Sequence, residues 1–233
     1  MKSMESNKAI VNIAVASENS WYHSGQKRLL ESLKNQGENA DFLFERHEHP
    51  KFLTPYADKI HAIYQAYKKG YTKILYLDCS IQAVRPLDDI WAYINENGYY
   101  LYESGYNCAQ TCNDKSLNAY GITRDEAQSI YECASNVFGI DCETQRGKDF
   151  VEKIFASIST GAVYGHKFPN EEQRLQESQD TRFLHHRQDQ SVISLVAGLY
   201  KFSLEREGHF VSRWENAEHT MNENVIFTLK GGY

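Results

Sequence analysis

The chain carries, at residues 59–87, the run KIHAIYQAYKKGYTKILYLDCSIQAVRPL. Its first part has apolar residues at helical spacing and stops at Gly70, so the pattern predicts a helix over residues 56–69. Its second part, residues 73–77, is an uninterrupted apolar run typical of a strand buried on both faces. That strand delivers the carboxylate of Asp78 to its carboxyl end.

Other segments repeat these two patterns, apolar runs of strand length and helices with one apolar face. The predicted strands are residues 9–16, 41–45 and 99–102, and the predicted helices are residues 21–35 and 88–98. Strands that alternate with helices form a mainly parallel sheet. The sequence therefore predicts an α/β fold with a mainly parallel central sheet covered by helices on both faces. Ligands of such sheets bind outside the carboxyl ends of the strands, where Asp78 is expected.

The second half of the chain is less regular. Residues 107–147 are polar and weakly periodic apart from a helical stretch at residues 125–133, so we expect an inserted lid or acceptor-binding structure there. No repeat, linker or low-complexity segment divides the chain, and residues 1–233 are expected to form a single domain. The remaining predicted elements are a Gly-bounded strand at 159–165, a charged loop or helix at 170–187, a helix at 190–199, and late strands within 200–210 and 225–229.

Composition and charge exclude several classes of protein. The 233 residues include 25 Lys and Arg against 31 Asp and Glu, a formal net charge of −6, and 41% are hydrophobic, as in an ordinary globular domain. Because no run of five or more basic residues occurs, nucleic acid is not an expected partner. No window approaches the roughly 20 apolar residues of a membrane span, and residues 1–10 lack the apolar stretch of a signal peptide. We expect a cytoplasmic protein.

The five cysteines are an odd number in a chain of this size, which favours reduced thiols over a disulfide framework. The spacing of Cys108, Cys112, Cys133 and Cys142 leaves a structural zinc site conceivable. No Cys-x2-Cys pair or clustered histidine completes such a site, so zinc is the less favoured interpretation.

The order of features around Asp78 resembles a known enzyme family. A lysine on a helix (Lys59), an apolar strand that ends on a carboxylate, and the turn Arg85-Pro86-Leu87 are similar to the nucleotide-sugar core of GT-A-type glycosyltransferases, especially the glycogenin-like and related bacterial or viral families. In that family the strand ends in Asp-x-Asp, because carboxylates at i and i+2 can hold a hard divalent cation on two phosphate oxygens. Here the motif is Asp78-Cys79-Ser80, in which the hydroxyl of Ser80 is a weaker ligand. An aspartate at a strand end can also simply cap the following turn.

The resemblance implies roles for several residues of the first half of the chain. Lys59 and the end of the first strand, Ala16 and Ser17, would hold the nucleotide. Asp78 with Ser80 would place a Mn²⁺ or Mg²⁺ ion on the diphosphate.

Three later segments also resemble the family. Gly161, in the small-residue run 159–163, would let the donor sugar approach the backbone, although a bulge explains such a glycine equally well. Asp189 and Gln190 are similar to the Asp-Gln pair that opens a helix beside the donor sugar, which implies a catalytic role for Asp189 and a substrate-binding role for Gln190. An aspartate at a helix start also complements the helix dipole without any substrate. The candidates for a late metal ligand are His209 and His219.

The resemblance implies a glycosyltransferase that moves a sugar from a nucleotide diphosphate sugar, a UDP-sugar by default, to a hydroxyl of a carbohydrate or protein-glycan acceptor. A second interpretation, motivated by the missing second aspartate, is a catalytically inactive nucleotide-sugar or glycan-binding protein of the same fold. A third is a phosphotransfer enzyme, because an apolar strand ending in Asp also begins the haloacid-dehalogenase-type site. That site requires Asp-x-Asp-x-Thr/Val, and residues 78–82 supply only the first Asp.

Overall fold

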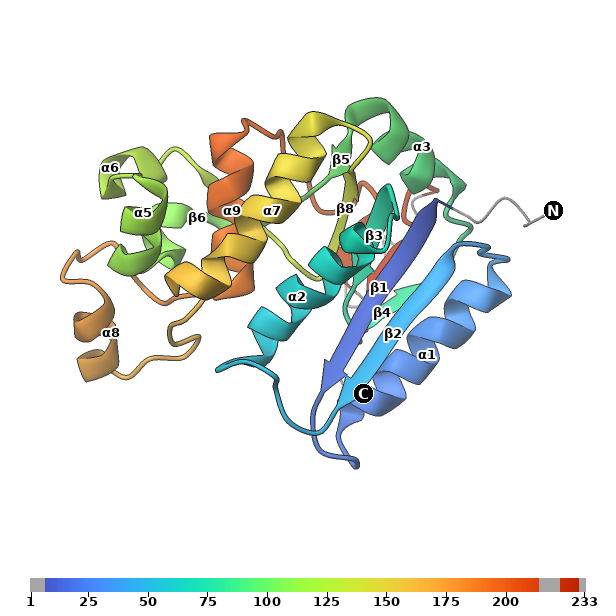
Figure 1. Ribbon diagram of the computed structural model, residues 1–233, viewed down its shortest axis with the longest axis horizontal. Helices are drawn as coiled ribbons and strands as arrows, with labels where there is room; N and C mark the ends of the chain where they lie inside the picture. Colours follow the sequence, from blue (N-terminus) through green and yellow to red (C-terminus); the bar gives the residue numbers. More distant parts are fainter. Residues whose placement is uncertain (1–6, 214–222, 231–233) are drawn as a thin grey trace.

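The computed structural model of the protein describes residues 7–213 and 223–230. The strands of its central sheet are β1 (Lys8–Val15), β2 (Asp41–His47), β3 (Lys73–Leu77), β5 (Tyr99–Tyr100) and β8 (Val137–Asp141). They lie in the order β2-β1-β3-β8-β5 (Figure 1). Strand β8 runs against the other four, because it pairs antiparallel with both β3 and β5 while β1 pairs parallel with β2 and β3. The predicted α/β fold is confirmed, with a mixed sheet in which most strands share one direction.

Helices cover both faces of this sheet (Figure 1). Helices α1 (Trp21–Asn35) and α3 (Asp88–Asn97) pack on one face, and α2 (Pro55–Lys68), α7 (Gln145–Thr160) and α9 (Asp189–Leu199) pack on the other. The bounds predicted for the helix at 21–35 and the strand at 73–77 are confirmed. Local signals explain the helix ends, since the hydroxyls of Ser20 and Thr54 cap the first turns of α1 and α2, and Gly98 ends α3 in the left-handed conformation.

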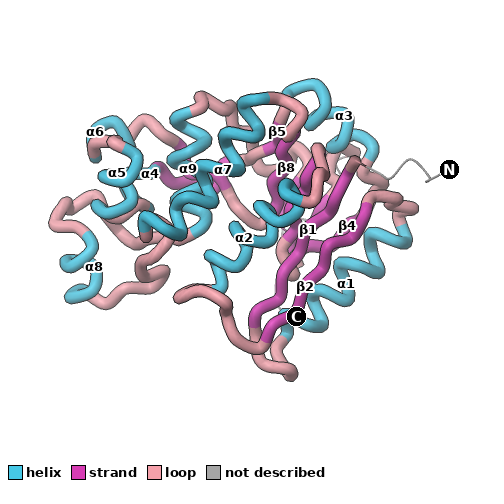
Figure 2. Tube along the Cα trace, in the orientation of Figure 1, coloured by secondary structure: helices cyan, strands magenta, loops and turns pink. Residues whose placement is uncertain are grey.

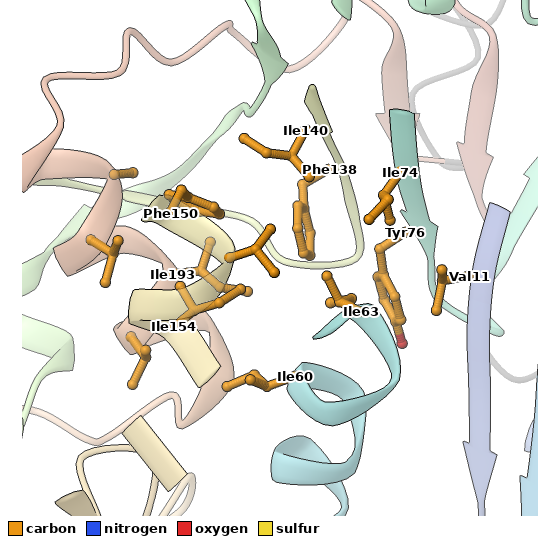
Figure 3. Close-up of a cluster of buried hydrophobic side chains, with 14 of the residues drawn as sticks. Val11, Ile60, Ile63, Ile74, Tyr76, Phe138, Ile140, Phe150, Ile154 and Ile193 are labelled. Carbon is orange, nitrogen blue, oxygen red and sulfur yellow. The ribbon is translucent and has the colours of Figure 1, made fainter. Parts of the chain in front are cut away.

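Alternate residues of the strands build two separate hydrophobic cores, as the pleat of a strand requires. Each large side chain that becomes fully buried there contributes roughly 1.5–3 kcal/mol. The first core lies between the sheet and α2, α7 and α9 (Figure 3) and includes Val11, Ile60, Ile63, Ile74, Tyr76, Phe138, Ile140, Phe150, Ile154 and Ile193. The second core lies between the sheet and α1 and α3 and includes Ile10, Leu29, Leu33, Leu75, Leu77, Ile94 and Val137.

A three-stranded sheet completes the second core. Its strands are β4 (Ile81–Ala83), β10 (Phe227–Leu229) and β9 (Val211–Arg213), in the order β4-β10-β9. Because β4 begins three residues after Asp78, this sheet joins the late part of the chain to the end of β3. The late strand predicted within 225–229 is confirmed, and the one predicted within 200–210 lies just beyond it, at β9.

Residues 107–147 do not form one insertion. The last part contains β7 (Tyr131–Cys133), which pairs with β6 (Glu103–Asn107), and β8, an inner strand of the central sheet. The sequence of β8 gives a weak strand pattern because Gly139 interrupts its apolar residues. The glycine is needed there, since an added Cβ would lie 2.3 Å from Ile94 Cδ1 of α3.

The earlier part of this region forms a small helical group. In place of the predicted helical stretch at 125–133 it contains α4 (Cys108–Thr111), α5 (Asp114–Tyr120) and α6 (Arg124–Ala127), which enclose a third core together with Leu195 of α9. Figure 2 shows these helices, with α8 (Glu171–Glu177), at the end of the molecule opposite α1 and β2.

The strand predicted at residues 159–165 is wrong. Helix α7 begins after the Thr144 cap and continues to Thr160, because Phe150 and Ile154 keep its inner face buried in the first core. Gly161 then ends the helix with φ +75°. The Gly-bounded pattern therefore marked a helix end.

Two further expectations concern cysteines and membranes. The five cysteines are free and buried, in keeping with reduced thiols. Within residues 7–213 and 223–230, none of the helices has the length and apolar character needed to cross a bilayer.

Gly25 is the point at which α1 touches the chain just after Asp78. A Cβ atom added there would lie 2.4 Å from the carbonyl oxygen of Cys79, and a backbone oxygen cannot yield as a side chain can. Gly25→Ala is expected to cost about 1–3 kcal/mol through this overlap, while better helix propensity returns at most about 1 kcal/mol. Urea denaturation measures the net loss of stability, with Lys27→Ala, an exposed change on the same helix, as the control. Equal stability of the two variants would contradict the close contact.

Candidate active site

A cavity of about 350 Å³ opens at the carboxyl ends of β1 and β3. Its walls also include the first turns of α1 and α9, the first half of α2, the segment before β8, and part of β10. We refer to it as the first cavity. The charged residues that line it are Lys59, Asp78, Lys167, Arg187 and Asp189.

The ammonium group of Lys59 lies at the centre of this charged set. Its Nζ is 2.8 Å from Asp189 Oδ2 and 3.5 Å from Asp78 Oδ1, and it donates to the carbonyl and hydroxyl of Ser135. It also lies 4.3 Å from the ring centroid of Tyr76. Burial lowers the pKa of Lys59, but the carboxylates of Asp189 and Asp78 outweigh it and the pKa is raised. Lys59 therefore stays protonated in a fully buried position.

Asp78 follows β3 directly and is partly exposed to the cavity. The hydroxyl of Tyr76 donates to Asp78 Oδ1 at 2.7 Å, and burial raises the pKa of that hydroxyl well above its usual value. The end of β3 is fixed from the side by Asn12, a buried amide in β1 that donates to the Leu77 carbonyl at 2.6 Å. The Sγ of Cys79 contacts the same Asn12 side chain. Asp78 is thus held in place by side chains of β1, β3 and α2.

Asp189 opens α9 and is only 2% exposed. Its carboxylate pairs with Lys59, so it does more than complement the helix dipole. The preceding Gln188 has φ 55° and ψ −114°, a sparsely populated positive-φ conformation that costs a non-glycine residue of order 1–3 kcal/mol and that recurs at functional sites. Next in the helix, Gln190 donates from Nε2 to the fully buried carboxylate of Glu132 at 2.7 Å.

Two cations of the first cavity, Arg187 and Lys167, were missed by the sequence prediction. Arg187 Nη2 is 3.5 Å from Gln190 Oε1, and Lys167 Nζ donates to the Tyr56 hydroxyl at 3.3 Å. Neither lies in a recognisable motif, and only the folded chain brings them together. A single sequence offers no local signal that distinguishes them from other basic residues.

Aromatic rings form the side of the first cavity near the end of β1. Trp21 and Tyr22 at the start of α1 stack with centroids 4.1 Å apart, and Tyr56 at the start of α2 completes the group. Burial raises the pKa of the Tyr22 and Tyr56 hydroxyls, so both stay neutral. Neutral, half-exposed rings of this kind suit stacking against a planar ligand.

A second cavity of about 440 Å³ adjoins the first. The two share Asn136, Arg187, Gln190 and Leu229. Behind their common wall lies Glu132, whose carboxylate accepts from the Gln190 amide and from the hydroxyl of Ser104, a residue of the second cavity.

The predicted residues at the first strand lie beside the first cavity and do not line it. Val15 and Ile13 of β1 line it instead. Ala16 donates its amide to the His47 carbonyl at the end of β2, and the Ser17 carbonyl accepts from Ser20 at the turn into α1. Both residues thus shape the loop at the cavity edge.

Other predicted residues lie elsewhere. Gly161 caps α7 next to Lys115 and lines neither cavity, because the segment that carries it is helical. His209 stacks on Phe210 with centroids 4.1 Å apart and lies 3.5 Å from Glu205, so it belongs to an aromatic cluster at the second core. Its assignment as a metal ligand beside Asp78 is not supported by this position. His219 lies outside the described residues.

The donor set for a divalent ion is small. In the part of the chain that the structure describes, no group of three or more His, Cys, Asp or Glu side chains could hold a metal, which also argues against the zinc interpretation. Asp78 and Ser80 both line the first cavity and supply two oxygen-bearing groups at i and i+2. Hard divalent ions often bind through one or two protein oxygens together with phosphate and water. These residues fit an ion that takes its other ligands from a bound diphosphate and from water.

The central lysine offers a direct test of the charge arrangement. Lys59→Met leaves the carboxylate of Asp189 buried without a cation, and loss of one partner of a buried pair costs about 3–5 kcal/mol. We expect urea denaturation to show this loss, and the double variant Lys59→Met/Asp189→Asn to recover part of it because no uncompensated charge remains at that position. A double variant less stable than Lys59→Met would show that the pairing is not what makes the single change costly.

No protein-family model matches the sequence, and a search of curated proteins finds no match. Solved structures do match over nearly the whole chain. A glycosyltransferase involved in the glycosylation of the major capsid of PBCV-1 aligns with a TM-score of 0.51 and 11% identity, covering 97% of this chain and 93% of that chain. Mouse xyloside xylosyltransferase 1, in its apo form, aligns with a TM-score of 0.50 and 7% identity, covering 96% of this chain and 97% of that chain. The chain therefore has the fold of GT-A glycosyltransferases.

Proposed function

We propose that the protein is a glycosyltransferase that moves a sugar from a nucleoside diphosphate sugar to an acceptor hydroxyl. The observation that carries this proposal is the meeting of Lys59, Asp78 and Asp189 in one cavity at the carboxyl ends of the strands. These three residues come from three distant elements. Ligands of open α/β sheets bind outside the carboxyl ends of the strands, and the fold is that of GT-A glycosyltransferases, so both support a donor site here.

The first cavity is the proposed donor site. The rings of Trp21, Tyr22 and Tyr56 would contact the base, with uridine as the default. Ala16 and Ser17, which follow Val15 at the cavity edge, would border the nucleoside through their backbone.

Asp78 and Ser80 would hold a Mn²⁺ or Mg²⁺ ion against the diphosphate. Such an ion supplies electrostatic stabilisation of the charge that develops on the departing diphosphate. Tyr76 and Lys59 keep the Asp78 carboxylate oriented toward this place.

Asp189 would act on the sugar. It lines the first cavity directly before Gln190, a residue that both cavities share, so it would lie on the side of the donor that faces the proposed acceptor. The pairing with Lys59 keeps the carboxylate in one orientation, which is the pre-organisation that stabilises a transition state.

The second cavity is the proposed acceptor site. It adjoins the first, and its lining offers hydroxyl and aromatic groups of the kind that bind carbohydrate, Ser104, Tyr102 and Tyr106 among them. The acceptor hydroxyl would enter from this side and meet the donor sugar at Asn136 and Gln190.

An inactive nucleotide-sugar or glycan-binding protein of the same fold is the second candidate. The observation that favours it is Ser80, which leaves Asp78 as the one carboxylate of the motif. The phosphotransfer interpretation is not carried forward, because the two matching structures described above are glycosyltransferases.

The test is a donor screen with the purified protein. UDP-glucose, UDP-galactose, UDP-xylose and GDP-mannose are incubated with Mn²⁺, and both thermal stabilisation and release of nucleoside diphosphate are measured, with Asp78→Asn as the site control. Release of diphosphate that Asp78→Asn abolishes supports the glycosyltransferase. Stabilisation without release supports the binding protein. Two results would contradict the assigned site. One is that none of these donors stabilises the protein, and the other is that Asp78→Asn releases diphosphate as well as the wild type does.

Ser80 permits a test of the metal position. Ser80→Asp restores a second carboxylate at i+2, and hard cations bind more tightly to more highly charged oxygen sets. We expect this variant to bind Mn²⁺ at least about tenfold more tightly in calorimetric titrations with UDP present, and Ser80→Ala to bind it more weakly. Unchanged Mn²⁺ affinity in Ser80→Asp would mean that this side chain does not face the ion.

Asp189 permits a test that separates chemistry from nucleotide binding. Asp189→Asn is nearly isosteric, and we expect turnover to fall about 100-fold while UDP affinity stays within about threefold, because the carboxylate addresses the sugar. Asp88→Asn, at the first residue of α3, is a matched control outside both cavities. Full turnover in a folded Asp189→Asn protein would leave this carboxylate with a structural role only.

A further inference from the structure

Arg187 and Lys167 differ from the other charged residues of the first cavity in their partners. Lys59 forms ion pairs with both Asp78 and Asp189. Neither Arg187 nor Lys167 forms an ion pair with a carboxylate in the described part of the chain. Their contacts are neutral, namely the Gln190 amide oxygen for the arginine and the hydroxyl and ring of Tyr56 for the lysine.

The two cations are held near each other by the backbone that carries them. The His186 amide donates to the His166 carbonyl at 3.0 Å, which links the two segments side by side. Arg187 and Lys167 directly follow these two histidines, so they lie at neighbouring positions of the linked segments. The side chain of Gln188 adds a second link at 2.9 Å, to the carbonyl of Gly165. On the arginine side, the Arg187 amide donates to the Ser191 hydroxyl at 2.8 Å, which fixes the start of α9.

The charges around Lys167 and Arg187 favour an anion in the first cavity. Burial lowers the pKa of Lys167 and the charge of Arg187 lowers it further, and the carboxylates of Asp189 and Asp78 offset only part of this shift. The lining of the first cavity contains three cations and two carboxylates in a protein whose formal net charge is −6. These five groups together carry one net positive charge. Lys59 is the cation that pairs with the two carboxylates, whereas the contacts of Arg187 and Lys167 are neutral.

We propose that Arg187 and Lys167 bind the diphosphate of the nucleotide donor, an inference that rests on the proposed function and deepens it. Arg187 lines both cavities, so it addresses the phosphate attached to the sugar, where negative charge develops as the bond to the sugar breaks. Lys167 contacts Tyr56 on the base side, so it addresses the phosphate nearer the nucleoside. Part of the diphosphate charge is thereby compensated by the protein itself, and binding persists when divalent ions are removed.

The experiment measures anion binding by titration calorimetry in EDTA. The probes are inorganic pyrophosphate, UDP, GDP and uridine, and the proteins are the wild type, Arg187→Gln, Lys167→Gln and the charge-matched control Lys153→Gln on the exposed face of α7. We expect each of the first two variants to lose at least tenfold in pyrophosphate and UDP affinity with less than threefold change for uridine. Lys153→Gln is expected to behave as the wild type, and Arg187→Lys to recover part of the loss.

The outcomes separate the two proposals. Wild-type affinities for pyrophosphate and UDP in Arg187→Gln and Lys167→Gln would overturn the diphosphate assignment and leave the proposed donor site standing. Pyrophosphate binding that depends on both cations, with UDP and GDP binding no more tightly than pyrophosphate, would support the anion site and count against a nucleotide donor. A wild-type protein that binds pyrophosphate and UDP only when Mn²⁺ replaces EDTA would overturn the inference, because the ion would then carry the charge.

Discussion

The ammonium group of Lys59 joins three other parts of the chain at one point. From the first half of α2 it reaches the first residue of α9, the carboxylate that follows β3, and Ser135 in the segment before β8. Removing an ammonium and a carboxylate from water costs several kcal/mol each, which only close pairing and further hydrogen bonds can offset. Every element that contributes a partner to this ammonium group must therefore keep its position. The same partners line the first cavity, so the ion pairs also fix the shape of the cavity.

Stability alone does not explain such a pair, because well-packed apolar side chains of the same volume often stabilise a protein equally well or better. The pair instead fixes orientation. Two carboxylates that share one lysine cannot rotate independently, and Tyr76 restricts Asp78 further through its hydroxyl. The strained backbone at Gln188 agrees with this function, because it sets the position of Asp189 at the start of α9 for the ion pair with Lys59.

The sequence predicted those elements whose signals are local. The helix at 21–35 has its own cap and apolar face, and the strand at 73–77 is an apolar run between a glycine turn and Asp78, so neighbouring residues suffice to define both. Strand β8 was missed because Gly139, which makes room for Ile94 of α3, removes the side chain that would have marked it as a strand. Gly161 misled for the related reason that a glycine at a helix end and a glycine in a strand look alike in sequence.

The sequence also predicted part of the candidate site. Lys59, Asp78, Asp189 and Gln190 line one cavity, and their order along the chain was the signal that singled them out.

Arg187 and Lys167 had no such signal. What distinguishes them is that neither pairs with a carboxylate of residues 7–213 and 223–230, a property that exists only after the chain has folded. Charged side chains that form ion pairs within the protein and those that do not have different functions in this cavity. A group that must hold its position is best paired with the protein, as Lys59 is, whereas a group that must attract an anion is best left for the ligand to pair. Cations without an ion-pair partner are especially useful in an acidic protein. Its net charge of −6 repels a diphosphate at long range, and local positive charge has to overcome that repulsion. Both cations line the first cavity, where that local attraction acts, and Arg187 also lines the second.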